Sequence, residues 1–258
     1  MTSDIELTRA GATQILRFAR PQKKNALTGA MYAALAEAIA AGDADGDVAV
    51  HVIFGSGGVF SAGNDLGDFL ETAEGAGGLG GDVLRFIRLL PKIRKPLLAG
   101  VDGKAVGIGT TLLFHCDLVY ATPESEFSTP FLDLGLVPEA GSSLLAPRLM
   151  GPQRAFELLA LGAPFSAQRA LQSGFVNGLV SKADLEAHVL AAAMKLAAKP
   201  PDALLMSRRL LRGDASDISG RIEEEALAFE RRLRSPEARE AFQAFFEKRT
   251  PDFTKVRS

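Results

Sequence analysis

The chain has 258 residues, of which 47% are hydrophobic and 23% charged, the ordinary balance of a globular protein with one sizeable core. Its formal net charge of −2 provides no general attraction to nucleic acid or anionic lipid, and its single cysteine, Cys116, excludes a disulfide framework and a multi-thiolate metal site. The uncharged runs are too short to span a membrane, and Asp4 and Glu6 stand where a signal peptide carries positive charge. We therefore expect a cytoplasmic protein that binds a small molecule, without a metal, a nucleic acid or a membrane as its partner.

The first part of the chain predicts strands that alternate with helices. Two β-prone runs, Ile5–Arg9 and Thr13–Phe18, predict a hairpin, and Thr28 is placed to cap an amphipathic helix. Val48–Phe54 predicts a buried strand, and the glycine-rich residues Glu74–Gly81 predict a surface loop.

The same alternation continues to about residue 121. Val83–Leu90 predicts a helix, Leu97–Val101 a strand, Gly107–Phe114 a short helix and Leu118–Ala121 another strand. This order is typical of an α/β domain with largely parallel strand pairing.

After residue 151 the pattern becomes almost entirely helical, with one predicted strand at Phe175–Val180. We expect residues 1–195 to form the core that carries the site, and residues 196–258 to form a helical region that packs across subunits. The helical stretch Asp202–Lys248 predicts this packing, because its many apolar positions need a partner surface. Those positions include Leu204, Leu205, Leu210, Leu211, Leu227 and Phe229.

Two glycine-bearing segments and one carboxylate stand out as candidates for chemistry. Residues 60–66 follow a buried strand, and Gly107 opens a helix whose first N–H groups lack internal partners. Two such segments can offer two backbone donors to one developing oxyanion, although ordinary turns also explain these glycines. Glu139 is the one charged residue of the apolar stretch 134–140, where burial would raise its pKa and make it a usable general base. A glutamate on a surface loop is the alternative interpretation.

Other catalytic signatures are missing or weak. No dinucleotide fingerprint, phosphate-binding loop or nucleophile elbow is complete in this sequence. His115 and Cys116 have the types of a base and a nucleophile, but adjacent helical residues point about 100° apart, so we expect both to pack in the core.

The two glycine-bearing segments belong to a longer series of short motifs. In chain order these are Arg20-Pro21 with Asn25-Ala26-Leu27, residues 60–66, Lys95-Pro96, residues 103–107, Cys116-Asp117-Leu118, Glu126-Phe127, residues 134–138 and residues 174–177. The series, which covers nearly the whole chain, resembles the crotonase (enoyl-CoA hydratase/isomerase) superfamily. The resemblance implies an α/β fold built as a spiral of ββα turns with a helical C-terminal region, and assembly as a homotrimer or a dimer of trimers.

The resemblance also implies an acyl-CoA substrate, with coenzyme A entering as the thioester and no separate cofactor. By position, the thioester oxygen would accept hydrogen bonds from the backbone N–H groups of Asn64 and Ile108. The residues expected to contact the substrate or its CoA are Lys24, Ser61, Ala62, Gly63, Asn64, Asp65, Leu66, Gly107 and Phe131. Lys23 is the alternative to Lys24 at the CoA phosphates, and Asp65 is expected to act as a loop or helix-cap residue.

The carboxylates indicate which reaction of the superfamily the resemblance implies. Hydratases hold a water molecule with two glutamates, and the corresponding positions carry Thr111 and Phe131 here. The glutamate that follows a proline, Glu139, is instead similar to the single base of peroxisomal-type delta-3, delta-2 enoyl-CoA isomerases. The resemblance therefore implies that Glu139 moves a proton along a 3-enoyl-CoA to give 2-enoyl-CoA. Phe131, Leu134 and Leu136 would exclude water from the site.

Three other classes of function stay open at this point. The first is another crotonase reaction on an acyl-CoA, including hydration by a different arrangement of groups. The second is a crotonase-fold serine peptidase, which the sequence disfavours because no serine lies in a suitable elbow with a partnered histidine. The third is an acyl-CoA-binding protein without catalysis, against which the presence of Glu139 argues.

Overall fold

The computed structural model describes residues 4–67 and 79–256, and its centre is a six-stranded sheet. In spatial order its strands are β1 (Ile5–Ala10), β2 (Thr13–Phe18), β3 (Val50–Phe54), β4 (Leu97–Val101), β6 (Leu118–Ala121) and β9 (Gly178–Leu179). β1 and β2 form the predicted antiparallel hairpin, and every later pair of neighbours is parallel. Parallel pairing requires crossover connections, which accounts for the alternation of strands and helices in the sequence.

A second row of short strands runs beside this sheet. Its members are β5 (Lys104–Val106), β7 (Glu126–Ser128) and β8 (Phe165–Ser166). Two isolated bridges, Leu27 with Asn64 and Ser61 with Ala105, extend the row toward the N-terminus. Successive turns of the chain thus add a strand to the main sheet and a short segment to the second row before a helix returns, which is the predicted spiral.

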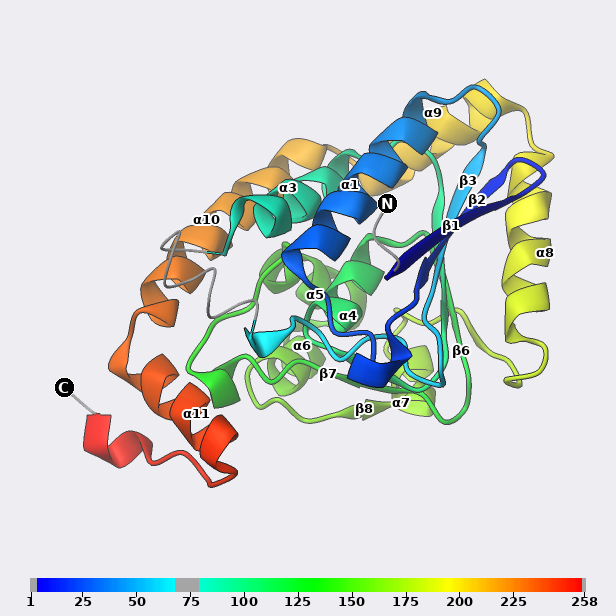
Figure 1. Cartoon of the computed structure of the whole chain (residues 1–258). Coiled ribbons are helices and arrows are strands. Elements are labelled where there is room, and N and C mark those ends of the chain that lie inside the picture. The colour runs from blue at the N-terminus through cyan, green and yellow to red at the C-terminus, as the bar shows by residue number, and fades with distance from the viewer. Residues whose placement is uncertain (1–3, 68–78, 257–258) are drawn as a thin grey trace.

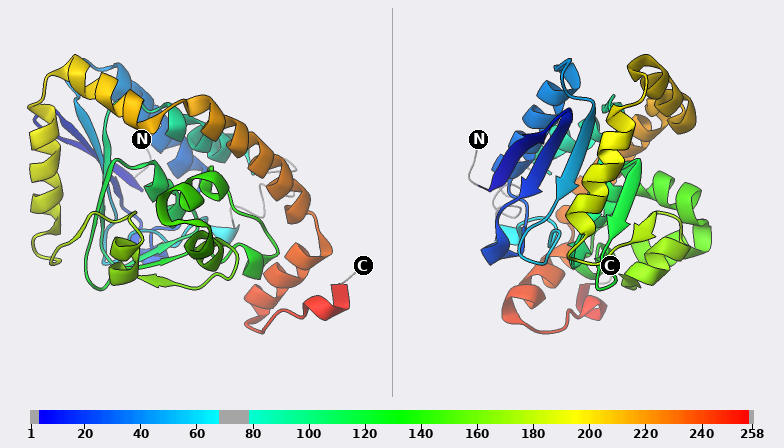
Figure 2. Two further views of the ribbon diagram at one scale, coloured as in Figure 1. Left: turned by 180° about the vertical axis from the view of Figure 1, so that it is seen from behind. Right: turned by 90° about the vertical axis from the view of Figure 1, so that its right-hand side faces the viewer.

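Helices cover both faces of the main sheet (Figures 1 and 2). In the described residues the α-helices are α1 (Gly29–Ala44), α3 (Gly81–Leu89), α4 (Ile108–Thr111), α5 (Ser142–Met150), α6 (Pro152–Leu159), α7 (Ala167–Gln172), α8 (Leu185–Ala197), α9 (Pro201–Arg212), α10 (Ala215–Leu233) and α11 (Pro236–Glu247). Short 3-10 turns are η1 (Pro21–Lys23), η2 (Leu90–Lys92), η3 (Leu112–His115), η4 (Leu132–Leu134) and η5 (Phe253–Val256). The larger hydrophobic core lies between the sheet, α1 and α3, and a smaller one lies beneath α8. Thr28 caps α1 as predicted, since its Oγ1 accepts a hydrogen bond from the backbone N of Met31 at 3.3 Å.

The last three helices wrap around this core, with α10 along α3 and α11 beside η4 (Figure 1). Asp117 fixes α9 to the sheet: its two carboxylate oxygens accept hydrogen bonds from Arg208 Nε and Arg212 Nε, each at 2.8 Å. The same carboxylate accepts from the backbone N of Leu97 at 2.8 Å. Within the described residues, no helix combines the length and the apolarity needed to cross a lipid bilayer.

The structure departs from the sequence prediction at the shortest elements. Of the strand predicted at residues 175–180, only Gly178–Leu179 pairs with β6, while Phe175 and Val176 are buried in the core. The sequence does not predict β5, β7 or β8, because two or three residues are too few to show the alternation of a strand. The helix predicted at residues 107–114 is divided into α4 and η3. Residues 74–78 of the predicted surface loop lie outside the described residues, and Gly81 begins α3.

Candidate active site

The segment around Gly63 and the start of α4 lie against each other because both belong to the second strand row. Ser61 bridges Ala105, and the backbone N of Val106 donates to the carbonyl oxygen of Ser61 at 2.9 Å. Gly63 and Gly107 have φ angles of +86° and +55°, which side chains rarely permit. A Cβ atom added to Gly63 would lie 3.0 Å from the carbonyl oxygen of Val106. The two backbones therefore approach more closely than a side chain allows.

The backbone N–H groups of Asn64 and Ile108 are the two predicted oxyanion donors. Ile108 is the first residue of α4, so the helix supplies no acceptor for its N–H. Asn64 is bridged to Leu27, but the bonds of this bridge use the atoms of its neighbours, Gly63 O and Asp65 N. In the described part of the chain, neither donor group is bonded to a protein acceptor. Both residues line the same cleft, so both N–H groups are available to a ligand oxygen.

Buried polar groups hold the Asn64 segment from behind. The fully buried Asn25 donates through Nδ2 to the carbonyl oxygens of Ser56 at 2.9 Å and Val59 at 2.7 Å. The hydroxyl of Tyr32, on α1, donates to the side-chain oxygen of Asn64. The side-chain oxygen of Asn64 is thus occupied by Tyr32, whereas its backbone N–H is left for a ligand.

Two of the predicted ligand contacts do not line the cleft: Ser61 is buried, and Lys24 is exposed outside the cleft lining. Ser61 is fully buried, where its hydroxyl donates to the carbonyl oxygen of Asn25 at 2.9 Å and accepts from the backbone N of Gly63 at 3.1 Å. The carbonyl oxygen of Lys24 accepts from the N–H of Ala62, and the Lys24 side chain does not line the cleft. Sequence reasoning missed these supporting roles because polar residues at a turn look alike whether they face a ligand or the backbone.

Lys23 and Asp65 lie at the cleft wall. Lys23, the alternative considered for the CoA phosphates, lines the cleft, whereas Lys24 does not. Asp65 is ion-paired with Arg20 at 2.6 Å, and it accepts from the backbone N of Gly67 at 3.1 Å, as a helix-cap residue does. The positive charge of Arg20 therefore offsets this carboxylate beside the oxyanion donors.

The two segments open into a cleft of about 920 Å³. Its remaining predicted residues, Ala62, Gly63, Leu66, Gly107 and Phe131, all line it, together with Leu134 and Leu136. A further wall comes from α10, α11 and the tail that follows, through Phe229, Ala241, Phe245, Arg249, Thr250, Pro251 and Phe253. From the sequence, this region is expected only to pack across subunits. The chain contains no local signal that the tail returns to a cleft formed more than a hundred residues earlier.

Glu139 is buried, with only 3% of the residue exposed, and it is not among the residues that line the cleft, although Leu136, three positions before it, is. The hydroxyl of Thr111, at the end of α4, donates to Glu139 Oε1 at 2.6 Å. Burial raises the pKa of Glu139 to about 8, the Thr111 hydrogen bond opposes this rise, and the charge of Glu225 adds to it. The predicted burial and raised pKa of Glu139 are confirmed. The sequence predicts no contact between Thr111 and Glu139, and no proton-carrying role for Thr111. Their hydrogen bond is therefore visible only in the structure.

His115 supports the backbone next to Glu139. Its Nε2 lies 2.7 Å from the carbonyl oxygen of Ala140, and since a carbonyl only accepts, Nε2 carries the hydrogen. Burial lowers the pKa of His115 to about 4, so the ring is neutral near pH 7. The predicted packing role of His115 is confirmed.

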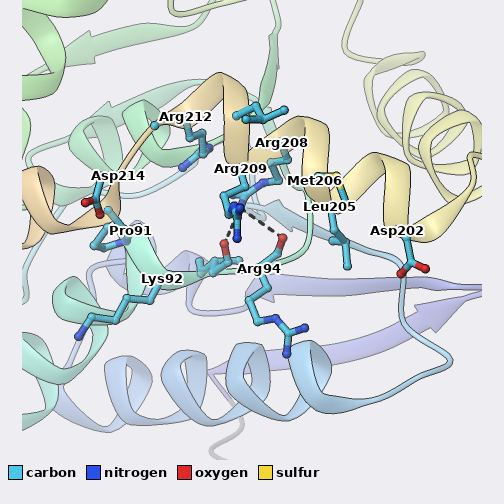
Figure 3. A pocket seen from close by; sticks show the side chains of 14 residues that line it. Pro91, Lys92, Arg94, Asp202, Leu205, Met206, Arg208, Arg209, Arg212 and Asp214 are labelled. Carbon is cyan, nitrogen blue, oxygen red and sulfur yellow. Dashed lines mark hydrogen bonds between the residues drawn. The ribbon is translucent and has the colours of Figure 1, made fainter.

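A second cleft, of about 950 Å³, lies between α9 and residues 91–94, which are the end of η2 and the two residues that follow it (Figure 3). Its basic wall consists of Lys92, Arg94, Arg208, Arg209 and Arg212. Arg208 and Arg212 are bound to Asp117, and Figure 3 shows Arg208 directed at backbone carbonyl oxygens of residues 93 and 94. None of the predicted site residues lines this cleft, and two of its charged groups, Arg208 and Arg212, join α9 to the sheet through Asp117.

The profile of the family described as enoyl-CoA hydratase/isomerase matches residues 8–256. The chain belongs to this family. A solved structure with a TM-score of 0.91, an enoyl-CoA hydratase/isomerase from Pseudoalteromonas atlantica T6c, is 35% identical and covers 97% of this chain and 100% of that one. The predictions of the crotonase superfamily and of its α/β fold are confirmed.

Members of the enoyl-CoA hydratase/isomerase family with different names are similar to this chain. Enoyl-CoA delta isomerase 2 of Rattus norvegicus is 35% identical over 246 residues, which are 93% of this chain and 63% of the relative. The protein of the same name from Homo sapiens is 36% identical over 207 residues, or 52% of its length. The chain thus spans less than two thirds of these two isomerases. The 2,3-dehydroadipyl-CoA hydratase of Escherichia coli is 30% identical over 252 residues, 97% of this chain and 98% of that protein.

Proposed function

We propose that the protein isomerises 3-enoyl-CoA to 2-enoyl-CoA, with Glu139 as the single proton carrier. The observation that supports this most directly is the hydrogen bond between Glu139 and Thr111, which lies one helical turn beyond the donor Ile108. A buried carboxylate with a pKa of about 8 is thereby tied to α4, the helix whose first residue supplies the N–H of Ile108. Such a group both accepts and returns a proton near neutral pH, as a shuttle requires.

The reaction needs only groups of this kind. The Glu139 carboxylate removes a proton from the carbon next to the thioester carbonyl, and the electron pair of that C–H bond passes into a dienolate. The negative charge on the thioester oxygen is stabilised by the N–H groups of Asn64 and Ile108, each worth about 3 kcal/mol in a dry site. The Glu139 carboxylic acid then returns its proton two carbons further along, which moves the double bond and restores the base.

Hydration would require a second group that binds and activates water. The position of one hydratase glutamate holds Phe131, which is buried and apolar, and the other holds Thr111, whose hydroxyl donates to Glu139. Glu225 is another buried carboxylate, but both of its oxygens accept backbone N–H groups. These occupied or apolar positions favour isomerisation.

The cleft accounts for the rest of the proposed substrate. Apolar side chains from both parts of the chain, such as Leu134, Leu136 and Phe229, would surround the acyl group and keep water from the dienolate. The ammonium group of Lys23, at the cleft wall, would bind a phosphate of coenzyme A.

A hydratase is the second candidate, because the Escherichia coli hydratase matches this chain over nearly its whole length. The purified protein should convert 3-enoyl-CoAs of several chain lengths to 2-enoyl-CoAs without any other enzyme. In deuterated water, label should appear at the carbon that is reprotonated, unless the shuttled proton returns before it exchanges with solvent. Formation of 3-hydroxyacyl-CoA from 2-enoyl-CoA at a higher rate than isomerisation would replace this proposal with hydration.

We also propose that the protein is a homotrimer, or a dimer of trimers, joined through residues 196–258. Several large apolar side chains on α9 and α10 are exposed in the single chain: Met206, Leu210, Leu211 and Leu227. Apolar surface of this extent is commonly covered by a partner. Light scattering at micromolar concentration should give the mass of a trimer or hexamer, and a monomer would contradict this assignment.

A further inference from the structure

The turn that carries Glu139 has a backbone conformation that needs external support. Ala140 and Gly141 have φ angles of +58° and +72°, and the N–H of Ser142 donates back to the carbonyl oxygen of Glu139 at 3.1 Å. This is the geometry of a type I′ turn, which favours glycine or asparagine at both central positions. Alanine in the left-handed region costs free energy, so the turn depends on contacts that hold it.

One of these contacts comes from the C-terminal region. The buried face of α10 consists of residues at helical spacing: Ile218, Ile222, Glu225, Phe229 and Leu233. Glu225 is the one charged member of this face, and its side chain is nearly buried. A carboxylate among apolar residues is costly unless its oxygens find donors.

Glu225 finds those donors on the turn itself. Its Oε2 accepts from the backbone N of Gly141 at 2.6 Å, and its Oε1 accepts from the backbone N of Ser143 at 2.9 Å. A Cβ atom added to Gly141 would lie 3.0 Å from Ile218, so α10 also packs directly on the turn. The carboxylate thus fixes the residues that immediately follow the base, while His115 fixes the carbonyl oxygen of Ala140.

We propose that Glu225 is a positioning residue, through which α10 holds the catalytic turn and sets the electrostatic surroundings of Glu139. The inference rests on the proposed function, because it assumes that Glu139 is the base. In this inference α10 has two functions: Phe229 contributes to the cleft wall, and Glu225 positions the base.

Few other charges act on this turn. Arg221 lies on the same helix as Glu225, where its Nη1 donates to the hydroxyl of Ser143 at 3.2 Å and its Nε is paired with Glu224 at 2.9 Å. His115 is neutral near pH 7 because burial lowers its pKa to about 4. Burial raises the pKa of Glu225 too, and its hydrogen bonds with Ser143 and Gly141 and the charge of Arg221 oppose this rise. In its ionised form Glu225 is the charge that adds to burial in raising the pKa of Glu139.

Glu225→Gln and Glu225→Asp separate the two effects, with Glu230→Gln as the matched control. Gln removes the charge, so kcat should fall on the order of tenfold and the half-maximal pH of kcat/KM should move lower. Asp keeps the charge but is one methylene shorter, so kcat should fall while the half-maximal pH stays. Glu230 lies on the same helix, is 41% exposed and is paired with Arg234 at 2.7 Å, so its variant should match the wild type in both measurements.

The outcomes distinguish this inference from the proposed function. Wild-type kcat and an unshifted pH profile in folded Glu225→Gln would overturn the positioning role, even where Glu139→Gln abolishes turnover. A fall in kcat with an unshifted half-maximal pH in that variant would also overturn it, since it would reduce Glu225 to a structural residue. If thermal melting shows that Glu225→Gln does not fold, Glu225→Asp decides, and an unchanged kcat there contradicts the proposal. A Glu139→Gln enzyme with wild-type turnover would instead refute the proposed function.

Discussion

The two halves of the candidate site are built in different ways. The oxyanion half consists of backbone N–H groups, and it is fixed by strand pairing and by glycines with positive φ angles. The base half is one side chain, Glu139, on a turn that is fixed by hydrogen bonds donated by Thr111 and His115 and by backbone N–H groups that donate to Glu225. The first half therefore tolerates changes of side chain but not of backbone, and the second half depends on side chains.

The largest effect should come from the base half. Glu139→Gln keeps the size of the side chain but removes its basic lone pair, so kcat should fall by about two to four orders of magnitude. The KM should change little, because the interaction is needed only in the transition state. Steady-state kinetics, with thermal melting as the control for folding, test this. A variant that isomerises at nearly the wild-type rate would remove Glu139 from the mechanism.

In the oxyanion half, the damaging change is one that pushes the two backbones apart. A Cβ atom on Gly109 would lie 3.0 Å from Ser61 Cβ and 3.2 Å from its carbonyl oxygen, so Gly109→Ala should displace the N–H of Ile108. We expect a fall in kcat of roughly 10- to 100-fold, somewhat less than the loss of a whole donor. Gly220→Ala is the matched control, since nothing lies within 4 Å of the added atom on α10. Equal activities of the two variants would contradict the close approach of the segments.

The pH dependence should separate the halves again, because only the base half titrates. The pKa of Glu139 is raised to about 8, and the reaction needs the deprotonated form, so kcat/KM should rise with pH through this value. The gain between pH 7 and pH 9 should be about tenfold. Gly109→Ala should show the same profile at lower amplitude. A rate that is flat from pH 6 to pH 9 would exclude a base with this pKa.

The smallest effect should follow from a side-chain change in the oxyanion half. In the proposed mechanism Asn64 acts through its backbone N–H, and its side-chain oxygen accepts a hydrogen bond from the hydroxyl of Tyr32. Asn64→Ala should therefore lower kcat by no more than about fivefold, with most of the loss due to a looser backbone. Kinetics with one 3-enoyl-CoA suffice. If this variant lost activity as completely as Glu139→Gln, the Asn64 side chain would have to act on the substrate.

The same division explains what the sequence predicts well. Backbone features leave local marks, so the hairpin, the cap at Thr28 and the glycine-bearing segments are visible as patterns of residue type. Glu139 is visible because a lone charge in an apolar stretch is unusual. The two glutamates of hydratases are replaced by Thr111 and Phe131, and this replacement is what points the resemblance toward isomerases.

What the sequence does not predict are contacts between distant segments. Thr111 and Glu139 are 28 positions apart, and Glu225 lies 84 positions after Gly141. Only the folded spiral brings these groups together. The single available signal for Glu225 is its place in the apolar periodicity of α10, where a carboxylate implies a buried partner but does not say which.

The wall that α10, α11 and the tail add to the cleft has a consequence for how substrate preference can change in evolution. The base and the oxyanion donors lie in the spiral, whereas Phe229, Phe245 and Phe253 of the C-terminal region face the same cleft. Substrate preference can therefore drift in the tail while the chemistry stays constant. Residues of α10 are less free to change, because Glu225 lies one turn before Phe229 and binds the turn that carries Glu139. When such a protein is selected for new acyl groups, we therefore expect the first substitutions in α11 and η5.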